Sequence, residues 1–332
     1  MTATTRTATA TATATAAVTA TATATAYHRG ERGAQERAGQ LDHSRRSGRF
    51  IRGEMPDKAR EFLAGQTLLV VGAADGRARI WASMLTGEPG FVRAPEPSAV
   101  TVAVRPAHGD PLGDVLGAAL GGPVRVGMIA IEPVSRRRMR MNGTAVPDGA
   151  GLRVDLDQVY SNCPKYIQQR EPYVAPARSP AAPVHGTALT AAQQELVRRA
   201  DTFFIATADE DGNTDASHRG GNRGFVEVLS PTRLRWPDYA GNGMFNTLGN
   251  IEVNPAAGLL VPDWSTGSTL QLTGTARVDW DEEHAAAVPG AERLVEFTVT
   301  EVVEIADATA HRWTAPVFSP FNPRPAGADE AA

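Results

Sequence analysis

The sequence predicts a mainly β protein made of two similar small β-barrels with a few short helices. Short runs rich in β-branched and aromatic residues, such as FFIATA, RLRW and LVEFTVTEVVEI, are separated by Gly, Pro or Asp, as expected of antiparallel strands in a barrel. No long helices separate these runs, which argues against a doubly wound sheet. The same order of short motifs also occurs twice along the chain.

The repeat can be followed through four pairs of segments at a nearly constant separation. The pairs are 57–76 with 191–212, 81–92 with 215–226, 109–123 with 241–255, and 138–145 with 270–276. The first pair predicts an amphipathic helix, a strand and an Asp-Gly turn, and the third predicts a short helix that contains Leu-Gly and ends at a proline. Four matches in the same order indicate that one unit is duplicated.

The repeat and the composition together set the expected domain boundaries. We expect a disordered Thr/Ala tail (1–26), a first unit whose N-terminal segment wraps it (27–170), a Pro/Ala linker (171–189), a second unit (190–315) and a flexible tail (316–332). The tail at the start lacks the compact apolar core of a signal peptide.

Charge and cysteine content exclude several classes of protein. A net charge of −4 over 332 residues gives no general attraction to nucleic acid, and no apolar run is long enough to cross a bilayer. Cys163 is the only cysteine, so an internal disulfide framework is excluded and a reducing cytoplasm fits best. The histidines form no HExxH-type pair, and we expect no metal site.

Two stretches of the second unit are candidate anion sites. In SHRGGNRGF (217–225), the Gly220-Gly221 pair permits close approach of the backbone, while Ser217 and Arg219 suit phosphate oxygens. A solvated hairpin loop is the alternative interpretation. In NTLGN (246–250), the start of a short helix offers free N–H groups and the positive end of the helix dipole. Ordinary helix capping is the alternative there.

Basic and aromatic residues elsewhere add further candidates. In a strand over SRRRMRMNG, Arg136, Arg138 and Arg140 would point the same way and could clamp a phosphate, or face solvent at a sheet edge. Trp236 and Tyr239 could flank a planar ring, although such aromatics more often pack in a core. Lys165 and Tyr166, which follow Pro164, are expected at a helix start.

Taken together, these stretches resemble the pyridoxamine 5′-phosphate oxidase-like family of FMN-binding split β-barrels. The resemblance is strongest over 190–280, where ATADEDGNTDAS, RGGNRGFVEV and LQLTGTARV follow the family's order of elements. It is weaker over 57–168, which is similar to the companion unit of the family's tandem, long-chain members. The resemblance implies two tandem split barrels that form an intrachain pseudo-dimer with FMN between them.

The resemblance also implies a set of cofactor-binding residues. Those of the second unit are Ser217, Arg219, Gly220, Gly221, Asn222, Trp236, Asp238, Tyr239, Asn242, Asn246, Thr247 and Asn250. Those of the first unit are Arg136, Arg138, Arg140, Lys165 and Tyr166. Pyridoxamine-phosphate oxidases proper carry Arg-Lys where this chain has Asn246-Thr247, and their basic C-terminal substrate signature is missing here. Both differences argue against pyridoxal-phosphate synthesis.

We therefore expect an FMN-dependent oxidoreductase that acts on a small molecule and takes electrons from NAD(P)H or another donor. In such enzymes the flavin carries the electrons and the protein orients it. The alternatives are a non-catalytic flavin carrier and a split barrel that uses F420 or haem.

The number of sites and the oligomeric state can also be predicted. Asp110 and Asp114 in the first copy would repel a phosphate, so we expect one site per chain. The duplication supplies both halves of the site, which predicts a monomer, or a homodimer formed through other surfaces.

Overall fold

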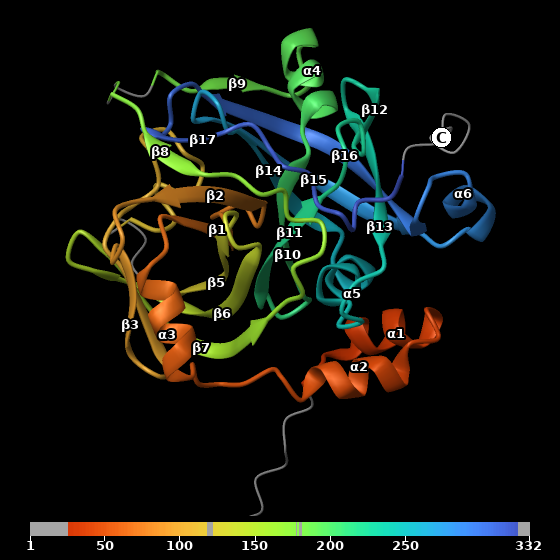
Figure 1. The fold of residues 1–332 in the computed structure, drawn as a ribbon, viewed down its shortest axis with the longest axis horizontal. Coiled ribbons are helices and arrows are strands. Elements are labelled where there is room, and N and C mark those ends of the chain that lie inside the picture. Colours follow the sequence, from red (N-terminus) through yellow and green to blue (C-terminus); the bar gives the residue numbers. More distant parts are fainter. Residues whose placement is uncertain (1–25, 118–121, 177, 179–180, 325–332) are drawn as a thin grey trace, which may run out of the picture.

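The computed structural model of the chain describes residues 26–117, 122–176, 178 and 181–324. Two antiparallel sheets with the same strand order dominate it (Figure 1). The first sheet has the order β2-β1-β5-β6-β7-β4-β3, and the second has β11-β10-β14-β15-β16-β13-β12 with β9 beside β16. This confirms the mainly β class that the sequence predicts, and the repeated order fits the expectation of two related barrels.

The first sheet contains β1 (Leu68–Ala74), β2 (Ile80–Thr86), β3 (Val92–Glu96), β4 (Ala99–Val102), β5 (Val124–Glu132), β6 (Arg137–Asp148) and β7 (Gly151–Ser161). The second contains β9 (Val184–Gly186), β10 (Thr202–Ala208), β11 (Thr214–Gly220), β12 (Glu227–Ser230), β13 (Arg233–Tyr239), β14 (Ala256–Asp263), β15 (Ser268–Asp279) and β16 (Ala291–Ile305). A small third sheet pairs β8 (Pro172–Val174) with β17 (His311–Trp313). The helices are α1 (Arg29–Arg37), α2 (Leu41–Gly48), α3 (Asp57–Ala64), α4 (Ala191–Arg199), α5 (Asn246–Val253) and α6 (Glu282–Ala286).

The central strands are buried on both faces because each serves two cores. On β1, Leu69 and Val71 point into the core of the first barrel, whereas Leu68 and Val70 pack in a core shared by the two sheets. The equivalent strand β10 divides its side chains between the second barrel and the shared core in the same way. These strands therefore appear in the sequence as unbroken apolar runs rather than alternating ones.

Two glycines let the sheets approach closely at this shared core. A methyl group at Gly127 on β5 would overlap the backbone of Asp215 on β11. One at Gly258 on β14 would overlap the backbone of Ile80 on β2. The two glycines hold matching register positions in their sheets, so the close contact is made twice, once on each side of the shared core.

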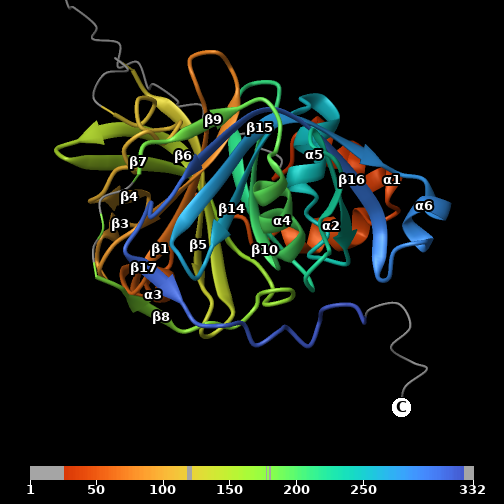
Figure 2. The same ribbon diagram turned by 90° about the horizontal axis from the view of Figure 1, so that it is seen from above.

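Helices α1 and α2 lie against α5 of the second unit, away from β3 and β4 (Figures 1 and 2). The buried Gln35 donates from Nε2 to the carbonyl oxygen of Met244 at 2.9 Å, and Ser44 Oγ donates to that of Gly243 at 2.6 Å. The expectation that the N-terminal segment wraps the first unit is therefore wrong for these two helices. Their polar side chains instead bond to the loop that precedes α5.

Segments expected to be irregular or flexible also take part in the fold. The linker 171–189 supplies β8 and β9. The expected tail is bonded to the second unit as far as it is described, because Asn222 Nδ2 donates to the carbonyl oxygen of Pro323 at 2.7 Å. The rest of the two expected tails, 1–25 and 325–332, lies outside the described residues.

Two helices predicted in the first unit are replaced by turns. Residues 111–117 form turns, whereas the matching segment of the second unit is α5. Gly113 disfavours a helix there, and the side chain of Asp110 accepts from the nearby N–H of Leu112 in the turn. Lys165 and Tyr166 likewise lie in a turn, in which Tyr166 has a φ of 66°. Among the described residues, no helix is long and apolar enough to cross a membrane.

Candidate functional site

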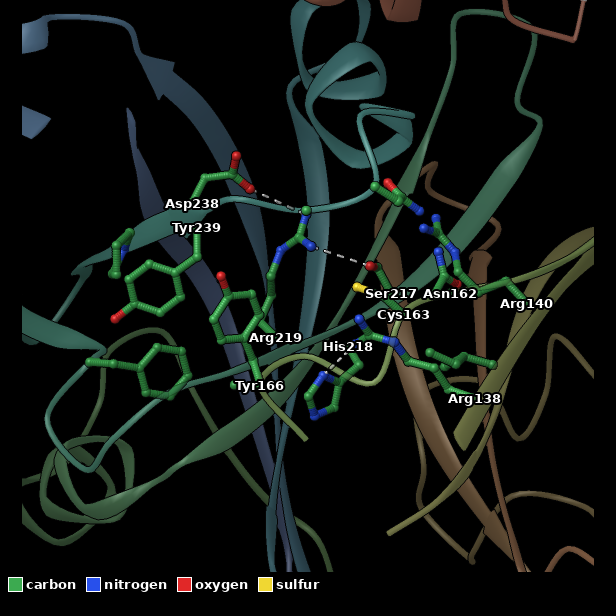
Figure 3. A pocket seen from close by; sticks show the side chains of 16 residues that line it. Arg138, Arg140, Asn162, Cys163, Tyr166, Ser217, His218, Arg219, Asp238 and Tyr239 are labelled. Carbon is green, nitrogen blue, oxygen red and sulfur yellow. Dashed lines mark hydrogen bonds and ion pairs between the residues drawn. The ribbon is translucent and has the colours of Figure 1, made fainter. Parts of the chain in front are cut away.

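A hollow, about 620 Å³ with its opening to solvent included, lies where β5 and β6 of the first sheet meet β11 and β13 of the second (Figure 3). The first unit contributes Ile129, Arg138, Arg140, Asn162, Cys163 and Tyr166 to its lining. The second contributes Ser217, His218, Arg219, Gly220, Phe225, Pro237, Asp238, Tyr239, Gly241 and Asn242.

Two arginines reach the hollow from β6, and their positions follow from strand geometry. Arg138 and Arg140 are two residues apart on the strand, so both side chains point to the same face. Arg136 precedes the strand in a turn with a φ of 54°, and its guanidinium donates to the carbonyl oxygen of Ile167. The expectation that all three arginines act together is therefore wrong for Arg136.

The two β6 guanidiniums differ in how their charge is balanced. Arg140 forms a buried ion pair with Asp215, which also accepts a hydrogen bond from Tyr160. Arg138 instead lies 2.8 Å from His218 Nδ1. Burial lowers the pKa of His218 well below its usual value, so the ring is neutral at pH 7 and accepts from Arg138. Burial also lowers the pKa of Arg138 to about 10, which still leaves it charged at pH 7.

A third guanidinium enters from the second unit. Arg219 on β11 lies 3.9 Å from Asp238 and 3.5 Å from Ser217 Oγ. Asp238 is itself shared, because Arg293 approaches its other oxygen at 3.7 Å. Figure 3 shows Arg219 extending toward the first unit's residues from the opposite wall. The hollow is therefore positively charged overall and suits an anionic ligand.

Several buried polar atoms around the hollow have no hydrogen-bond partner within the described part of the chain. They are Nε of Arg138, Nε of Arg140, Oδ1 of Asn162 and Oδ1 of Asn246. Buried polar atoms are nearly always paired in folded proteins, because leaving one unpaired costs about 1–3 kcal/mol. Arg138, Arg140 and Asn162 line this hollow and Asn246 lines an adjoining one, so a polar ligand bound there would complete the bonding.

The start of α5 forms the wall of an adjoining hollow of about 460 Å³ that also contains Arg140 and Arg219. Phe245, which precedes the helix, has a φ of 62°, and no side chain caps the first turn. Asn246 and Thr247 both line this hollow, as the sequence predicts. An uncapped helix start directs N–H groups and a positive partial charge toward its surroundings.

Aromatic residues flank the first hollow at one end. The rings of Tyr166 and Tyr239 lie 5.1 Å apart at 38°, and Tyr166 donates to the carbonyl oxygen of Ala240 at 3.0 Å. Burial raises the pKa of Tyr239 to about 12, so its hydroxyl stays protonated at neutral pH. Trp236, by contrast, is buried in the barrel core against Phe203, and the expectation that it lies beside the ligand is wrong.

The structure brings together most of the residues that the sequence singled out, from both units. Lining one or both hollows are Arg138, Arg140, Tyr166, Ser217, Arg219, Gly220, Asp238, Tyr239, Asn242, Asn246 and Thr247. Neither hollow is lined by Arg136, Lys165, Gly221, Asn222, Trp236 or Asn250.

Three of the excluded residues have structural partners that explain their positions. Asn222 bonds to the C-terminal segment at Pro323, as described above. Asn250 donates to Thr207 Oγ1 at 3.0 Å on the far side of α5. The Gly221 carbonyl oxygen accepts from Gln168 at 3.1 Å.

Sequence reasoning missed other residues of the lining. His218 could have been found because it lies between two predicted residues on β11. Asn162 and Cys163 carry no comparable signal, because they follow the end of β7 and reach the hollow only through the packing of the two units.

The equivalent position on the other side of the shared core is filled by the protein's own side chains. Matching strand registers place Ser83 where the second unit has Ser217, and Gln271 where the first unit has Arg140. Gln271 donates from Nε2 to Ser83 at 3.1 Å and to Asp110 at 3.0 Å, and Ser83 also donates to Asp110. Ser83, Asp110 and the Gln271 amide nitrogen are thus bonded to one another, and Gln271 Oε1 is left without a partner in the described chain.

The fold and the hollow define a class of protein: a mainly β chain with a cationic hollow between its two sheets. Residues 189–310 match the family model described as pyridoxamine 5′-phosphate oxidase. This match covers the second unit and supports a pyridoxamine 5′-phosphate oxidase-like split barrel there. No curated protein matches the sequence.

Solved structures with partial similarity were also found. A candidate pyridoxamine 5′-phosphate oxidase from Lactobacillus delbrueckii is 22% identical, with 35% of this chain and 93% of that chain covered and a TM-score of 0.30. A pyridoxinephosphate oxidase family protein from Clostridium acetobutylicum is 12% identical, with 36% and 89% covered and a TM-score of 0.27. An F420 reductase is 17% identical, with 32% and 91% covered and a TM-score of 0.25.

Proposed function

We propose that the chain binds FMN in the two adjoining hollows and acts as a flavin-dependent oxidoreductase. The observation that carries this proposal is the convergence of Arg138 and Arg140 from the first unit with Arg219 and the start of α5 from the second. This arrangement supplies cations and free N–H groups for a phosphate.

The phosphate fits best between Arg140, Arg219 and the first turn of α5. The Nε of Arg140 has no partner within the described chain, and guanidinium groups bind phosphate oxygens through strong charge-assisted bonds. The neutral Asn246 and Thr247 add N–H groups rather than charge. Related oxidases carry Arg-Lys where this chain has the neutral Asn246-Thr247. Arg140 and Arg219 therefore supply the positive charge that the phosphate needs.

The ring system fits the wider hollow beside Tyr166 and Tyr239. Tyrosine rings can contact a planar ligand and exclude water from one side of it. The unpaired Oδ1 of Asn162 is available to accept from a ring or ribityl donor. When bound, the flavin supplies the electron-transfer chemistry, and these residues supply its orientation.

Occupancy should be one flavin per chain, because the equivalent position is filled by Ser83, Asp110 and Gln271. The reason for a single site is therefore these hydrogen bonds, rather than repulsion of a phosphate by Asp110 and Asp114. Asp110 acts through these bonds, whereas Asp114 is exposed.

Because both units belong to one chain, a monomer would hold the whole site, and a homodimer would form through other surfaces. We place the protein in the cytoplasm, acting on a small molecule with NAD(P)H or another electron donor.

The visible absorption spectrum of the purified protein, followed by titration with FMN and with riboflavin, tests this proposal. Flavin bands and tighter binding of FMN support it. Flavin bands without reduction by NAD(P)H or another donor would indicate a carrier, a Soret band would indicate haem, and selective binding of F420 would indicate a deazaflavin protein.

Substitution of Arg219 by alanine tests the phosphate contacts. A guanidinium–phosphate bond contributes about 1.5–3 kcal/mol, so Arg219→Ala should weaken FMN binding roughly tenfold or more. Riboflavin lacks the phosphate, and its affinity should change far less. Arg136→Ala is the matched control, because Arg136 bonds to carbonyl oxygens outside both hollows. A larger loss of FMN affinity in Arg136→Ala than in Arg219→Ala would contradict the assignment.

A further inference from the structure

Helices α1 and α2 bond to three successive carbonyl oxygens of the loop that leads into α5. The donors and acceptors are Ser47 to Asn242, Ser44 to Gly243 and Gln35 to Met244, at 2.6, 2.6 and 2.9 Å. Ser44 and Gln35 are buried, with exposed fractions of 0% and 2%. These bonds link a segment near the start of the chain to the wall of the proposed phosphate site, about 200 residues later.

The same helices also fix the first turn of α5. Glu31 on α1 accepts a hydrogen bond from the Asn246 side chain. Gly30 faces Gly249 so closely that a methyl group on Gly30 would overlap the Gly249 carbonyl oxygen. The helix and the loop before it are therefore held by one continuous contact surface.

Peptide geometry determines what this contact does to the loop. In a trans peptide the N–H points opposite to the C=O. Carbonyl oxygens held toward α1 and α2 thus leave the following N–H groups pointing away from these helices. Met244 N–H is taken up by Asn242 Oδ1 at 3.1 Å. In the described chain, the N–H groups of Phe245 and of the first turn, 246–248, make no hydrogen bond.

The conformation of Phe245 shows that the loop needs such support. Its φ of 62° is unfavourable for a bulky residue and persists only where surrounding contacts enforce it. Independently of the helix, Arg140 is 5% exposed, lines the same hollow and has an unpartnered Nε. Together with the unbonded N–H groups at the start of α5, this unpartnered Nε points to an anion at this position.

We infer that Gln35, Ser44 and Ser47 are positioning residues, which hold the loop 242–245 so that the N–H groups at the start of α5 face the phosphate of the ligand. The inference rests on the proposed function and assigns to α1 and α2 the task of preorganising the site. The apparent dissociation constant of a ligand rises as the population of the competent loop conformation falls.

The test uses the full-length Ser44→Ala/Ser47→Ala variant, with FMN and riboflavin as probes. Loss of two hydrogen bonds should raise the dissociation constant for FMN about tenfold. Riboflavin binding should stay within about twofold of the wild type, since its affinity does not depend on phosphate contacts. Amide hydrogen exchange over 243–248 should become faster. Ser47→Thr, which keeps the hydroxyl, should bind FMN better than Ser47→Ala.

Thr300→Ala is the matched control, because it also removes a hydroxyl that donates to a carbonyl oxygen, that of Thr273 at 3.0 Å, far from the hollow. It should change neither FMN affinity nor exchange over 243–248. Equal weakening of FMN and riboflavin, or unchanged FMN affinity despite faster exchange, would overturn the inference.

Inorganic phosphate separates this inference from the proposed function. Phosphate should slow amide exchange at 245–248 in the wild type but not in the double variant. That result supports the positioning role even if the wild type binds no flavin, in which case only the proposed function fails. A wild type in which neither phosphate nor FMN slows exchange at these amides overturns the inference.

Discussion

Two glycines in α1, three residues apart, should respond to alanine in opposite ways. At an ordinary helix position, Gly→Ala stabilises by about 1 kcal/mol, because alanine loses less conformational freedom on folding. Gly33 has open space around it, with no heavy atom within 4 Å of an added methyl group. Gly33→Ala should therefore raise the free energy of unfolding by about 1 kcal/mol.

Gly30→Ala should destabilise the protein despite the same gain in helix propensity. Its methyl group would overlap the carbonyl oxygen of Gly249 on α5, and a backbone atom cannot move aside as a flexible side chain can. Overpacking of this kind costs about 1–3 kcal/mol, more if α1 separates from α5. Because the propensity gain is common to both, the two variants should differ by roughly 1–3 kcal/mol, and Gly30→Ala falls below the wild type once the overlap costs more than about 1 kcal/mol.

Thermal and urea unfolding of both variants, beside the wild type, measure this difference. At this chain length, a change of 1 kcal/mol moves the melting temperature by about 2 °C or less, so the pair should separate by several degrees. Amide exchange would show whether any loss is confined to α1 and α5. If Gly30→Ala stabilised the protein as much as Gly33→Ala, the close glycine-to-glycine packing of α1 on α5 would be refuted.

Three further predictions concern the ligand and the buried carboxyl group of the first unit. Denaturing the purified protein should release about one FMN per chain, because one helix start is available per chain; release near two would show that Ser83, Asp110 and Gln271 do not block the second position. When the protein is diluted until light scattering shows only monomer, the flavin should stay bound. Loss of the flavin in step with dissociation of a dimer would place the site between chains. Burial raises the pKa of Asp110 from 3.8 to about 6. A pKa raised on folding means that the fold disfavours the ionised form. Ionisation of Asp110 therefore lowers the free energy of unfolding progressively as the pH rises from about 4 to 6, by up to roughly 3 kcal/mol. Unfolding of Asp110→Asn at pH 4 and pH 7 should show the variant gaining stability relative to the wild type with rising pH; a pH-independent difference would contradict this.

The sequence by itself determined the class of fold and much of one wall of the site. Strand-forming runs punctuated by Gly, Pro and Asp are local signals, and they identify antiparallel strands without knowledge of their partners. The motif order repeated at 57–168 and 190–280 matches the strand order that the two sheets share. Ser217, Arg219, Asn246 and Thr247 were found because glycine-rich turns and helix starts carry their chemistry in adjacent residues.

Tertiary structure alone decided which distant residues meet. Arg138 and Arg140 face the hollow, and Arg136 does not, because the strand begins after a turn whose position the alternation of arginines does not reveal. Whether a polar residue meets a ligand or another side chain depends on contacts across the two sheets. Asp110 is bonded to Gln271, which lies 161 residues away. The same reason applies to α1 and α2: their bonds to the loop before α5 join residues about 200 positions apart, a distance over which local sequence patterns carry no information.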